Sequence, residues 1–264
     1  MSPGDATDRI LRAHLREMPF HRVLIRTIEA RILSEVELPR PVLDIGCGDG
    51  HFGSVLFPDG ADVGLDRGIA DLAEARGRRV YRLLVGADSG SMPFQAARFG
   101  SVVSNCVFEH IPDIDRTIAE ISRVLRPGGT FACTVIGDRF RELLTDERAW
   151  RRLGLSAAHR AYVGWFNRKA AHFHFDSPAQ WTKRFASAGL TVRRWRYYMS
   201  PEATRAMHRD HYLSIPHLVA RKLTGRWVPF PSLTDTSFWV RRFRRLADEP
   251  EPKEGSCVAF VCSK

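Results

Sequence analysis

The side chains with the clearest chemical potential lie in a glycine-rich segment near the start of the chain. Residues 43–50 read LDIGCGDG, so glycine recurs at every second position after a short apolar run. Because glycine has no Cβ, this spacing lets a ligand approach the main chain closely. The pattern is GxGxG, not the GxGxxG of dinucleotide sites, and the carboxylates of Asp44 and Asp49 would oppose a phosphate group. The segment therefore predicts a site for a ligand that carries cationic groups.

The elements around this loop alternate between strand and helix patterns. Apolar residues at helical spacing predict helix over residues 7–37, which Pro39 and Pro41 end. Strands are predicted at residues 42–46, 61–65, 79–86, 99–105 and 129–136, with helices at 68–77 and 113–124 between them. This alternation predicts βαβ units and a parallel sheet.

The second half of the chain is less regular. A helix is predicted to open at Ser177, a good N-cap, and to end at Gly189. Strands are predicted at 190–199 and 257–262. Residues 137–176 carry no strand pattern, and residues 200–255 form a second long interruption. We interpret both as insertions into one α/β domain.

Charge is distributed unevenly along the 264 residues. The formal net charge is +10, from 40 Lys and Arg against 30 Asp and Glu. Residues 1–136 hold 16 basic and 18 acidic side chains, whereas residues 137–264 hold 24 and 12. This asymmetry is typical of a region that meets an anionic partner, and equally of a solvated Arg-rich surface.

Other features of the composition narrow the class of protein. Apolar residues make up 44% of the chain, but no run approaches the eighteen that would suggest a spanning helix. The first twenty residues lack the apolar region of a secretory signal. The cysteines form no CxxC pair, which predicts buried thiols in a reducing compartment rather than disulfides or zinc: Cys47, Cys106, Cys133, Cys257 and Cys262. A cytoplasmic location is expected.

Several segments together resemble the class I S-adenosylmethionine-dependent methyltransferases, specifically the methyltransferase type 11 group. The resemblance covers about residues 42–136. LDIGCGDG resembles the first motif of that family, and Asp66, which ends VGLD, matches the acidic residue that takes the ribose hydroxyls. The segments ADS and MPF (87–89 and 92–94) are similar to the segment whose Asp contacts adenine. FGSVVSN resembles the fourth strand, which ends beside the sulfonium, and EHIPD and LRPGG match two further type 11 segments.

The resemblance implies an α/β fold with a Rossmann-like seven-stranded methyltransferase sheet, the last strand antiparallel beside the fifth, and helical or irregular lid insertions. It implies S-adenosyl-L-methionine as cofactor, with contacts from Asp44, Gly46, Cys47, Gly48, Gly50, Asp66, Arg67, Asp88, Ser89 and Asn105. The organisation expected is N-terminal helices at 1–38, a cofactor-binding core at 39–136, a lid insertion at 137–176, a core helix and sixth strand at 177–199, a second insertion at 200–255, and the final strand at 256–264.

Three histidines are candidate general bases. Methyl transfer from a sulfonium is an in-line displacement with a good leaving group, so a base is needed only if the acceptor must lose a proton. His110 follows the fourth predicted strand, and His172 and His174 precede the helix at 177. Each also has a structural interpretation as a hydrogen-bonded imidazole. The pairs His172-x-His174 and His208-x-x-His211 lack further ligands, so no metal is expected.

The expected function is methyl transfer, with O-methylation favoured, to a small acceptor that is anionic or membrane-associated. The segment FWVRRFRR (238–245) fits an anionic membrane or an acidic substrate, and equally a surface helix whose arginines extend into solvent. Two alternatives remain open: a nucleic-acid methyltransferase or binding protein that uses the basic half, and a non-methylating protein of this fold. The motifs of amino-methylating and cytosine-5 nucleobase enzymes are missing, which disfavours nucleic acid. The oligomeric state is left open.

Overall fold

The computed structural model describes residues 3–145, 147–169, 171–232 and 235–264. The chain forms two compact units, each assembled from three separate stretches. The first, which we call the sheet unit, comprises Ile32–Asp138, Asn167–Arg196 and Cys257–Lys264. The second, the helical unit, comprises Met1–Arg31, Arg139–Phe166 and Tyr197–Ser256.

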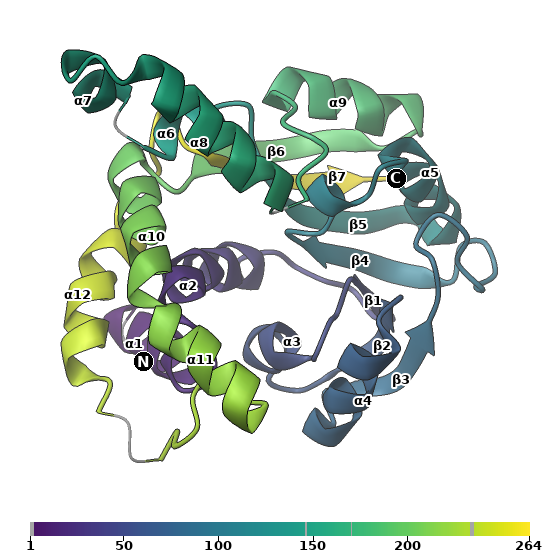
Figure 1. The fold of residues 1–264 in the computed structure, drawn as a ribbon. Coiled ribbons are helices and arrows are strands. Elements are labelled where there is room, and N and C mark those ends of the chain that lie inside the picture. The colour runs from purple at the N-terminus through teal and green to yellow at the C-terminus, as the bar shows by residue number, and fades with distance from the viewer. Residues whose placement is uncertain (1–2, 146, 170, 233–234) are drawn as a thin grey trace. The chain divides into compact units, whose positions relative to one another are not determined.

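A seven-stranded sheet in the order β3-β2-β1-β4-β5-β7-β6 organises the first of these units (Figure 1). Its strands are β1 (Val42–Ile45), β2 (Ala61–Asp66), β3 (Tyr81–Gly86), β4 (Phe99–Asn105), β5 (Leu125–Ile136), β6 (Thr191–Tyr198) and β7 (Cys257–Ser263). The first five strands pair in parallel, and β7 runs antiparallel to β5, with Ala132 opposite Val261. The predicted seven-stranded sheet with an antiparallel last strand is confirmed. The start of β5 differs, because it already pairs with β4 at Leu125 before a bulge.

Helices cover both faces of this sheet. They are α3 (His51–Leu56), α4 (Ile69–Arg78), the short 3-10 helix η1 (Phe108–His110), α5 (Ile114–Val124) and α9 (Pro178–Ser187). The predicted N-cap of α9 is confirmed: the Ser177 side chain accepts a hydrogen bond from the Gln180 amide, and the Gln180 side chain accepts one from the Ser177 amide. This capping box satisfies amides that the first helical turn leaves without partners.

The two faces of the sheet bury different cores. On one face, the Phe131 ring lies 5.8 Å from Phe108 and 5.6 Å from Phe185, which in turn lies 5.3 Å from Phe260. The next residue along β5, Ala132, points to the other face, because successive strand residues alternate. It belongs to a cluster with Leu33, Val42, Leu56 and Val103. Leu33 and Leu56 thus belong to the same buried cluster as residues of the three central strands β1, β4 and β5.

The helical unit contains most of α2 (Phe20–Ser34) and α8 (Ser156–Lys169), whose last turns enter the sheet unit. Its other helices are α1 (Pro3–Leu15), α6 (Phe140–Leu143), α7 (Glu147–Arg152), α10 (Pro201–Leu213), α11 (Ile215–Thr224) and α12 (Ser237–Ala247). The helix predicted over 7–37 forms as two helices, α1 and α2, because the chain breaks before Pro19. Proline has no amide hydrogen and disfavours helical geometry in the residue before it. Its carbonyl instead accepts the Arg22 amide as α2 begins.

The arginine-rich segment 238–245 forms α12, and its interpretation as a membrane-facing helix is wrong. Val240, Phe243 and Leu246 are buried. Arg242 lies 2.5 Å from Asp210, and Arg245 pairs with Glu202. The apolar side of α12 therefore packs in the core of the helical unit, and Arg242 and Arg245 are neutralised by acidic residues of the same unit. In the described part of the chain, no helix is both long and apolar enough to cross a membrane.

Candidate cofactor site

The glycine-rich loop links β1 to α3 and is fixed by the neighbouring strand. The amides of Gly46 and Cys47 both donate to the Leu65 carbonyl, at 2.7 and 3.2 Å. Gly46 and Gly48 have φ of 74° and 52°, a conformation that favours glycine. A Cβ on Gly46 would fall 2.3 Å from Val107, whereas a Cβ on Gly48 would meet no atom within 4 Å. The loop thus leaves open space beside its exposed backbone, as close approach by a ligand requires.

Asp66 ends β2 with a carboxylate that two backbone amides orient. Oδ2 accepts from the Gly48 amide at 2.9 Å, and Oδ1 accepts from the Gly68 amide at 2.8 Å. An ionised carboxylate has about four lone-pair positions, so these bonds leave acceptor capacity on both oxygens. The residue is half-buried and lines a cavity of about 440 Å³. Its geometry fits the hydroxyl pair of a ribose.

This cavity lies within the sheet unit, beyond the ends of β1, β2 and β3 and beside the segment that follows β4. It is lined by Ile45, Gly46, Leu65, Asp66, Arg67, Ala87, Asp88, Ser89, Gly90, Cys106, Val107, His110, Ile111, Pro112, Asp113 and Arg116. Ligands of open α/β sheets bind at this edge, outside the carboxyl ends of the strands. The cavity therefore has the position and the polar groups that an adenosine-bearing cofactor needs.

The segment after β3 is held in place by its own turn and by α5. Asp88 Oδ1 accepts from the Gly90 amide at 2.7 Å, and the Ser89 hydroxyl lies 3.0 Å from that of Thr117. Glu120 accepts the Met92 amide at 2.8 Å and pairs with Arg123, whose guanidinium holds the pKa of that carboxyl below its usual range. This anchoring presents Asp88 and Ser89 to the cavity.

Of the predicted cofactor residues, five line the cavity: Gly46, Asp66, Arg67, Asp88 and Ser89. The other five lie outside its lining and stay predictions: Asp44, Cys47, Gly48, Gly50 and Asn105. Asn105 Oδ1 accepts a hydrogen bond from the Thr134 hydroxyl at 2.8 Å.

Asp44 lies beneath the loop, almost completely buried. Its Oδ2 accepts a hydrogen bond of 2.5 Å from the Tyr81 hydroxyl. Burial raises the pKa of Asp44 to about 7, although the hydrogen bond from Tyr81 opposes that rise. A carboxyl poised in this way changes its charge near neutral pH, where a neighbouring cation would favour the ionised form.

Of the three candidate bases, only His110 lines the cavity. Its Nδ1 lies 3.2 Å from the Ala171 carbonyl, and since a carbonyl only accepts, Nδ1 carries a proton. In the neutral imidazole, Nε2 is then the acceptor. His172 lies beside it, with ring centroids 5.1 Å apart. His174 donates from Nε2 to the Ile111 carbonyl at 2.8 Å, so it holds the loop that carries Ile111.

Several lining residues were not singled out from the sequence. Cys106 follows β4 with φ of 49°, and its amide donates to Thr134. Pro112, Asp113 and Arg116 approach the cavity from the start of α5. The EHIPD motif was the available signal, because it spans two of these positions. No group of three or more potential metal ligands occurs among the described residues.

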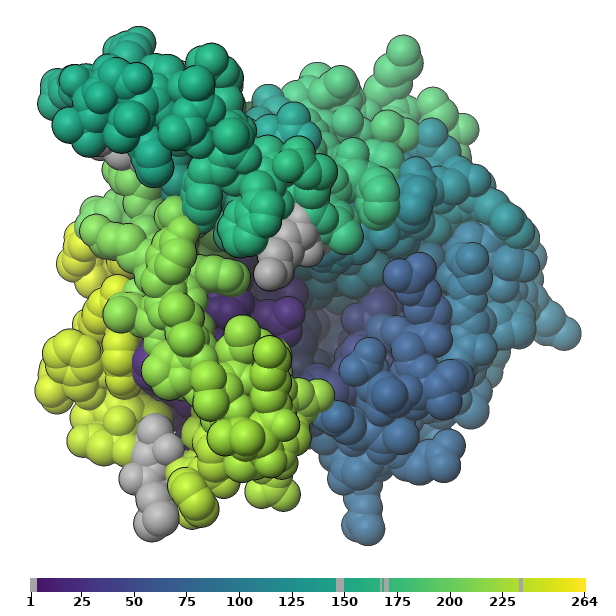
Figure 2. Space-filling view, viewed as in Figure 1, coloured from purple at the N-terminus to yellow at the C-terminus, as the bar shows by residue number. Residues whose placement is uncertain are grey.

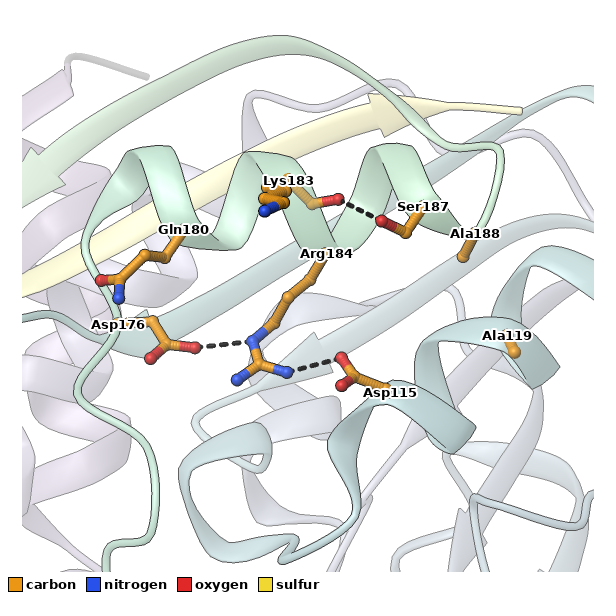
Figure 3. Close-up of a pocket in the computed structure, with 8 residues that line it drawn as sticks. All are labelled: Asp115, Ala119, Asp176, Gln180, Lys183, Arg184, Ser187 and Ala188. Carbon is orange, nitrogen blue, oxygen red and sulfur yellow. Dashed lines mark hydrogen bonds and ion pairs between the residues drawn. The ribbon is translucent and has the colours of Figure 1, made fainter.

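A second hollow of about 440 Å³ lies between α5 and α9 (Figure 3). Arg184 spans it and joins Asp176 at 2.7 Å to Asp115 at 2.6 Å. Both carboxylates are thereby engaged by one guanidinium. We interpret this arrangement as a bridge that ties the start of α9 to α5.

Comparison with known proteins agrees with this geometry. Residues 14–194 match the family model described as Methyltransferase domain, and the chain belongs to this family. The chain therefore contains a methyltransferase domain.

The relatives include the malonyl-[acyl-carrier protein] O-methyltransferases of Legionella pneumophila subsp. pneumophila and Geobacter sulfurreducens. The first is 36% identical over 119 residues, covering 42% of this chain and 41% of the relative. The second is 34% identical over 135 residues, covering 48% and 50%. The chain thus spans half or less of the length of these two curated relatives.

Solved structures show the same fold. A methyltransferase from Thermotoga maritima aligns over 98% of both chains with a TM-score of 0.57 and 15% identity. Geranyl diphosphate C-methyltransferase from Streptomyces coelicolor A3(2), crystallised with S-adenosyl-L-homocysteine, aligns over 89% of this chain and 74% of its own with a TM-score of 0.55 and 15% identity.

Proposed function

We propose that this chain transfers the methyl group of S-adenosylmethionine to an oxygen atom of a small acceptor, at the cavity beside β2, β3 and β4. The observation that carries the proposal is the meeting of Asp66 and Asp88 with His110 in the lining of one cavity. Asp66 and Asp88 suit the binding of the methyl donor, and His110 suits the binding of the methyl acceptor.

The donor residues divide according to their chemistry. Asp66 accepts hydrogen bonds from the ribose hydroxyls, using the lone pairs that the amides of Gly48 and Gly68 leave. Asp88 and Ser89 bind the adenine amino group. The glycine loop and the buried Asp44 hold the methionyl part, whose amino group is a cation. When bound, the cofactor supplies a methyl group on a positively charged sulfur.

On the acceptor side, His110 orients the attacking oxygen and takes its proton. Its Nδ1–H bond to the Ala171 carbonyl fixes the tautomer in which Nε2 accepts. A hydroxyl acceptor needs this base, whereas a carboxylate already carries a nucleophilic oxygen. For a carboxylate, Arg67 and Arg116, two residues that also line the cavity, supply the complementary charge. Positioning of the two reactants contributes most of the rate.

The relatives support oxygen as the acceptor atom, because several are named malonyl-[acyl-carrier protein] O-methyltransferase. That name describes an anionic acyl group. The excess of positive charge in residues 137–264 is compatible with such an acceptor.

The test is incubation of the protein with methyl-labelled S-adenosylmethionine and a panel of hydroxyl, carboxyl and amine acceptors, including acyl groups on acyl carrier protein. We expect S-adenosylhomocysteine and a labelled product in equal amounts. Alkali releases methanol from a methyl ester but leaves methyl ethers and N-methyl groups intact. Label that appears only on nitrogen or carbon would contradict the proposal. Labelling of transfer RNA or duplex DNA alone would support a nucleic-acid methyltransferase.

A further inference from the structure

Helix α11 and the loop after it present an apolar surface that the rest of the helical unit does not cover. None of the ten residues of α11 is buried. Figure 2 shows this segment at the surface in yellow-green. Leu223 is 80% exposed and Phe230 is 68% exposed, although most side chains of these types are buried in proteins. The exposed apolar residues, which we call the α11 face, are Ile215, Leu218, Val219, Leu223 and Phe230.

The geometry of the helix explains why one side is exposed. Ile215, Leu218, Val219 and Leu223 follow i, i+3, i+4 and i+8 spacing, so they form one stripe. His217 lies on the opposite side, where its ring centroid is 4.4 Å from that of Phe20 in α2. The start of α11 is also fixed, because the His21 amide donates to the Ser214 hydroxyl at 3.2 Å. The helix therefore rests on its His217 side within the helical unit and turns the stripe outward.

The charge of this segment has one sign. No Asp or Glu occurs from residue 211 to residue 234, whereas Arg221, Lys222 and Arg226 are present. Lys222 falls inside the apolar stripe. Across the ranges that the structure describes, neither Lys222 nor Arg226 forms an ion pair. The arginines of α12 differ, since Arg242 and Arg245 are neutralised by acidic partners.

We propose that the α11 face, with Lys222 and Arg226, docks the protein on an anionic lipid surface. Aliphatic and aromatic side chains in a stripe enter the boundary between headgroups and acyl chains, while Lys and Arg extend to lipid phosphates. A helix that lies in the plane of the surface need not be long enough to cross it. Nucleic acid is the poorer match, because aliphatic side chains offer neither base stacking nor hydrogen bonds. This inference does not rest on the proposed methyl acceptor.

The test is co-sedimentation of the full chain with vesicles of phosphatidylcholine alone or mixed with phosphatidylglycerol. We expect binding to the mixed vesicles and much weaker binding to the neutral ones. Binding should fall steeply at about 1 M salt, where the Debye length is about 3 Å. The double variant Lys222→Glu/Arg226→Glu should lower the partition coefficient at least about 25-fold, since each removed cation is worth about fivefold.

A pair of leucine variants distinguishes docking through the α11 face from nonspecific hydrophobic adsorption to vesicles. Leu223→Glu should lower vesicle binding at least about tenfold, because an exposed leucine side chain that would enter the lipid is replaced by a charge that the lipids repel. Leu153→Glu is the matched control, since Leu153 is 72% exposed and lies outside the α11 face. It should bind vesicles like the unmodified protein, and both variants should retain the circular dichroism spectrum of the parent.

Three results would overturn the proposal. The first is equal binding to neutral and mixed vesicles, or none to either. The second is unchanged vesicle binding by Leu223→Glu. The third is a Leu223→Glu variant that loses self-association or raises the KM for an acceptor without any change in vesicle binding, which would assign the α11 face to a second copy of the chain or to the acceptor.

Discussion

The buried contact between Asp44 and Tyr81 predicts that cofactor affinity depends on pH. Burial raises the pKa of Asp44 from 3.8 to about 7, so the empty site binds a proton over most of the acidic range. A cationic ligand amino group beside Asp44 favours the ionised form, so binding must release that proton. Well below pH 7 the affinity for S-adenosylhomocysteine should therefore fall about tenfold per pH unit, which amounts to about 50-fold between pH 7 and pH 5. Above the pKa it should become constant.

The same shift has a consequence for the stability of the ligand-free protein. The folded-state pKa lies above the unfolded value, so the stability that protonated Asp44 contributes is fully present below about pH 4 and is lost as pH rises through 7. A shift of about three units corresponds to about 4 kcal/mol. Replacement by Asn removes this titration. Asp44→Asn should therefore flatten both the affinity and the unfolding free energy between pH 5 and pH 8.

Isothermal titration calorimetry with S-adenosylhomocysteine measures the affinity and, in buffers of different ionisation enthalpy, the protons released. Tyr81→Phe keeps the Asp44 carboxyl but removes its hydrogen bond, so it should shift the pH dependence of binding instead of abolishing it. Loss of a hydrogen bond to a charged acceptor costs about 1.5–3 kcal/mol, so the inflection should move upward by about one to two pH units. A wild-type affinity that is constant from pH 5 to pH 8 would refute the coupling of binding to Asp44, and so would an Asp44→Asn variant that keeps the wild-type pH dependence.

Three further predictions concern the cofactor site, the base and the fold. Asp66→Ala should weaken binding of S-adenosylhomocysteine by about 10- to 100-fold, because it removes a charged acceptor for two hydroxyls. An unchanged affinity, measured by calorimetry, would contradict this role. His110→Gln should lower kcat by about 10²- to 10⁴-fold with a hydroxyl acceptor but only slightly with a carboxylate acceptor. An equal loss of S-adenosylhomocysteine formation with both acceptors would argue against His110 as a base. Gly100→Ala should cost about 1–3 kcal/mol in thermal unfolding, since its Cβ would lie 2.6 Å from the Pro39 carbonyl oxygen. Gly77→Ala, in the last turn of α4 where an added Cβ would meet no atom within 4 Å, should instead gain about 0.4–1 kcal/mol. Equal effects of the two substitutions would contradict this difference in packing.

The central strands of the sheet could be predicted from the sequence because they are mostly apolar. β1 and β4 are buried on both faces, so they read as continuous stretches that end at polar or glycine residues. Asp66 and Asp88 could be placed at one edge because parallel strands bring their carboxyl ends together. The place of β7 beside β5 followed only from the family resemblance, since pairing between distant strands leaves no local pattern.

Other features depend on contacts that the sequence does not display. Tyr81 and Asp44 are separated by 37 positions, so their hydrogen bond could not be inferred from spacing. The arginines of α12 looked like a surface for anions, but Arg242 and Arg245 pair with Asp210 and Glu202, which come from α10. Conversely, α11 carried no strong signal, and its exposure became apparent only when the side that rests on Phe20 was known.

The interleaving of the two units has a practical consequence for dissecting this protein. The chain passes from one unit to the other after residues 31, 138, 166, 196 and 256, so neither unit is a contiguous piece of sequence. No single truncation can release either unit intact, and a fragment ending near residue 138 would lack the β7 partner of β5. A single proteolytic cut would leave both products with incomplete sheets or helical cores. Variants that test one unit are therefore best made in the full chain, because each unit depends on segments of chain that pass through the other.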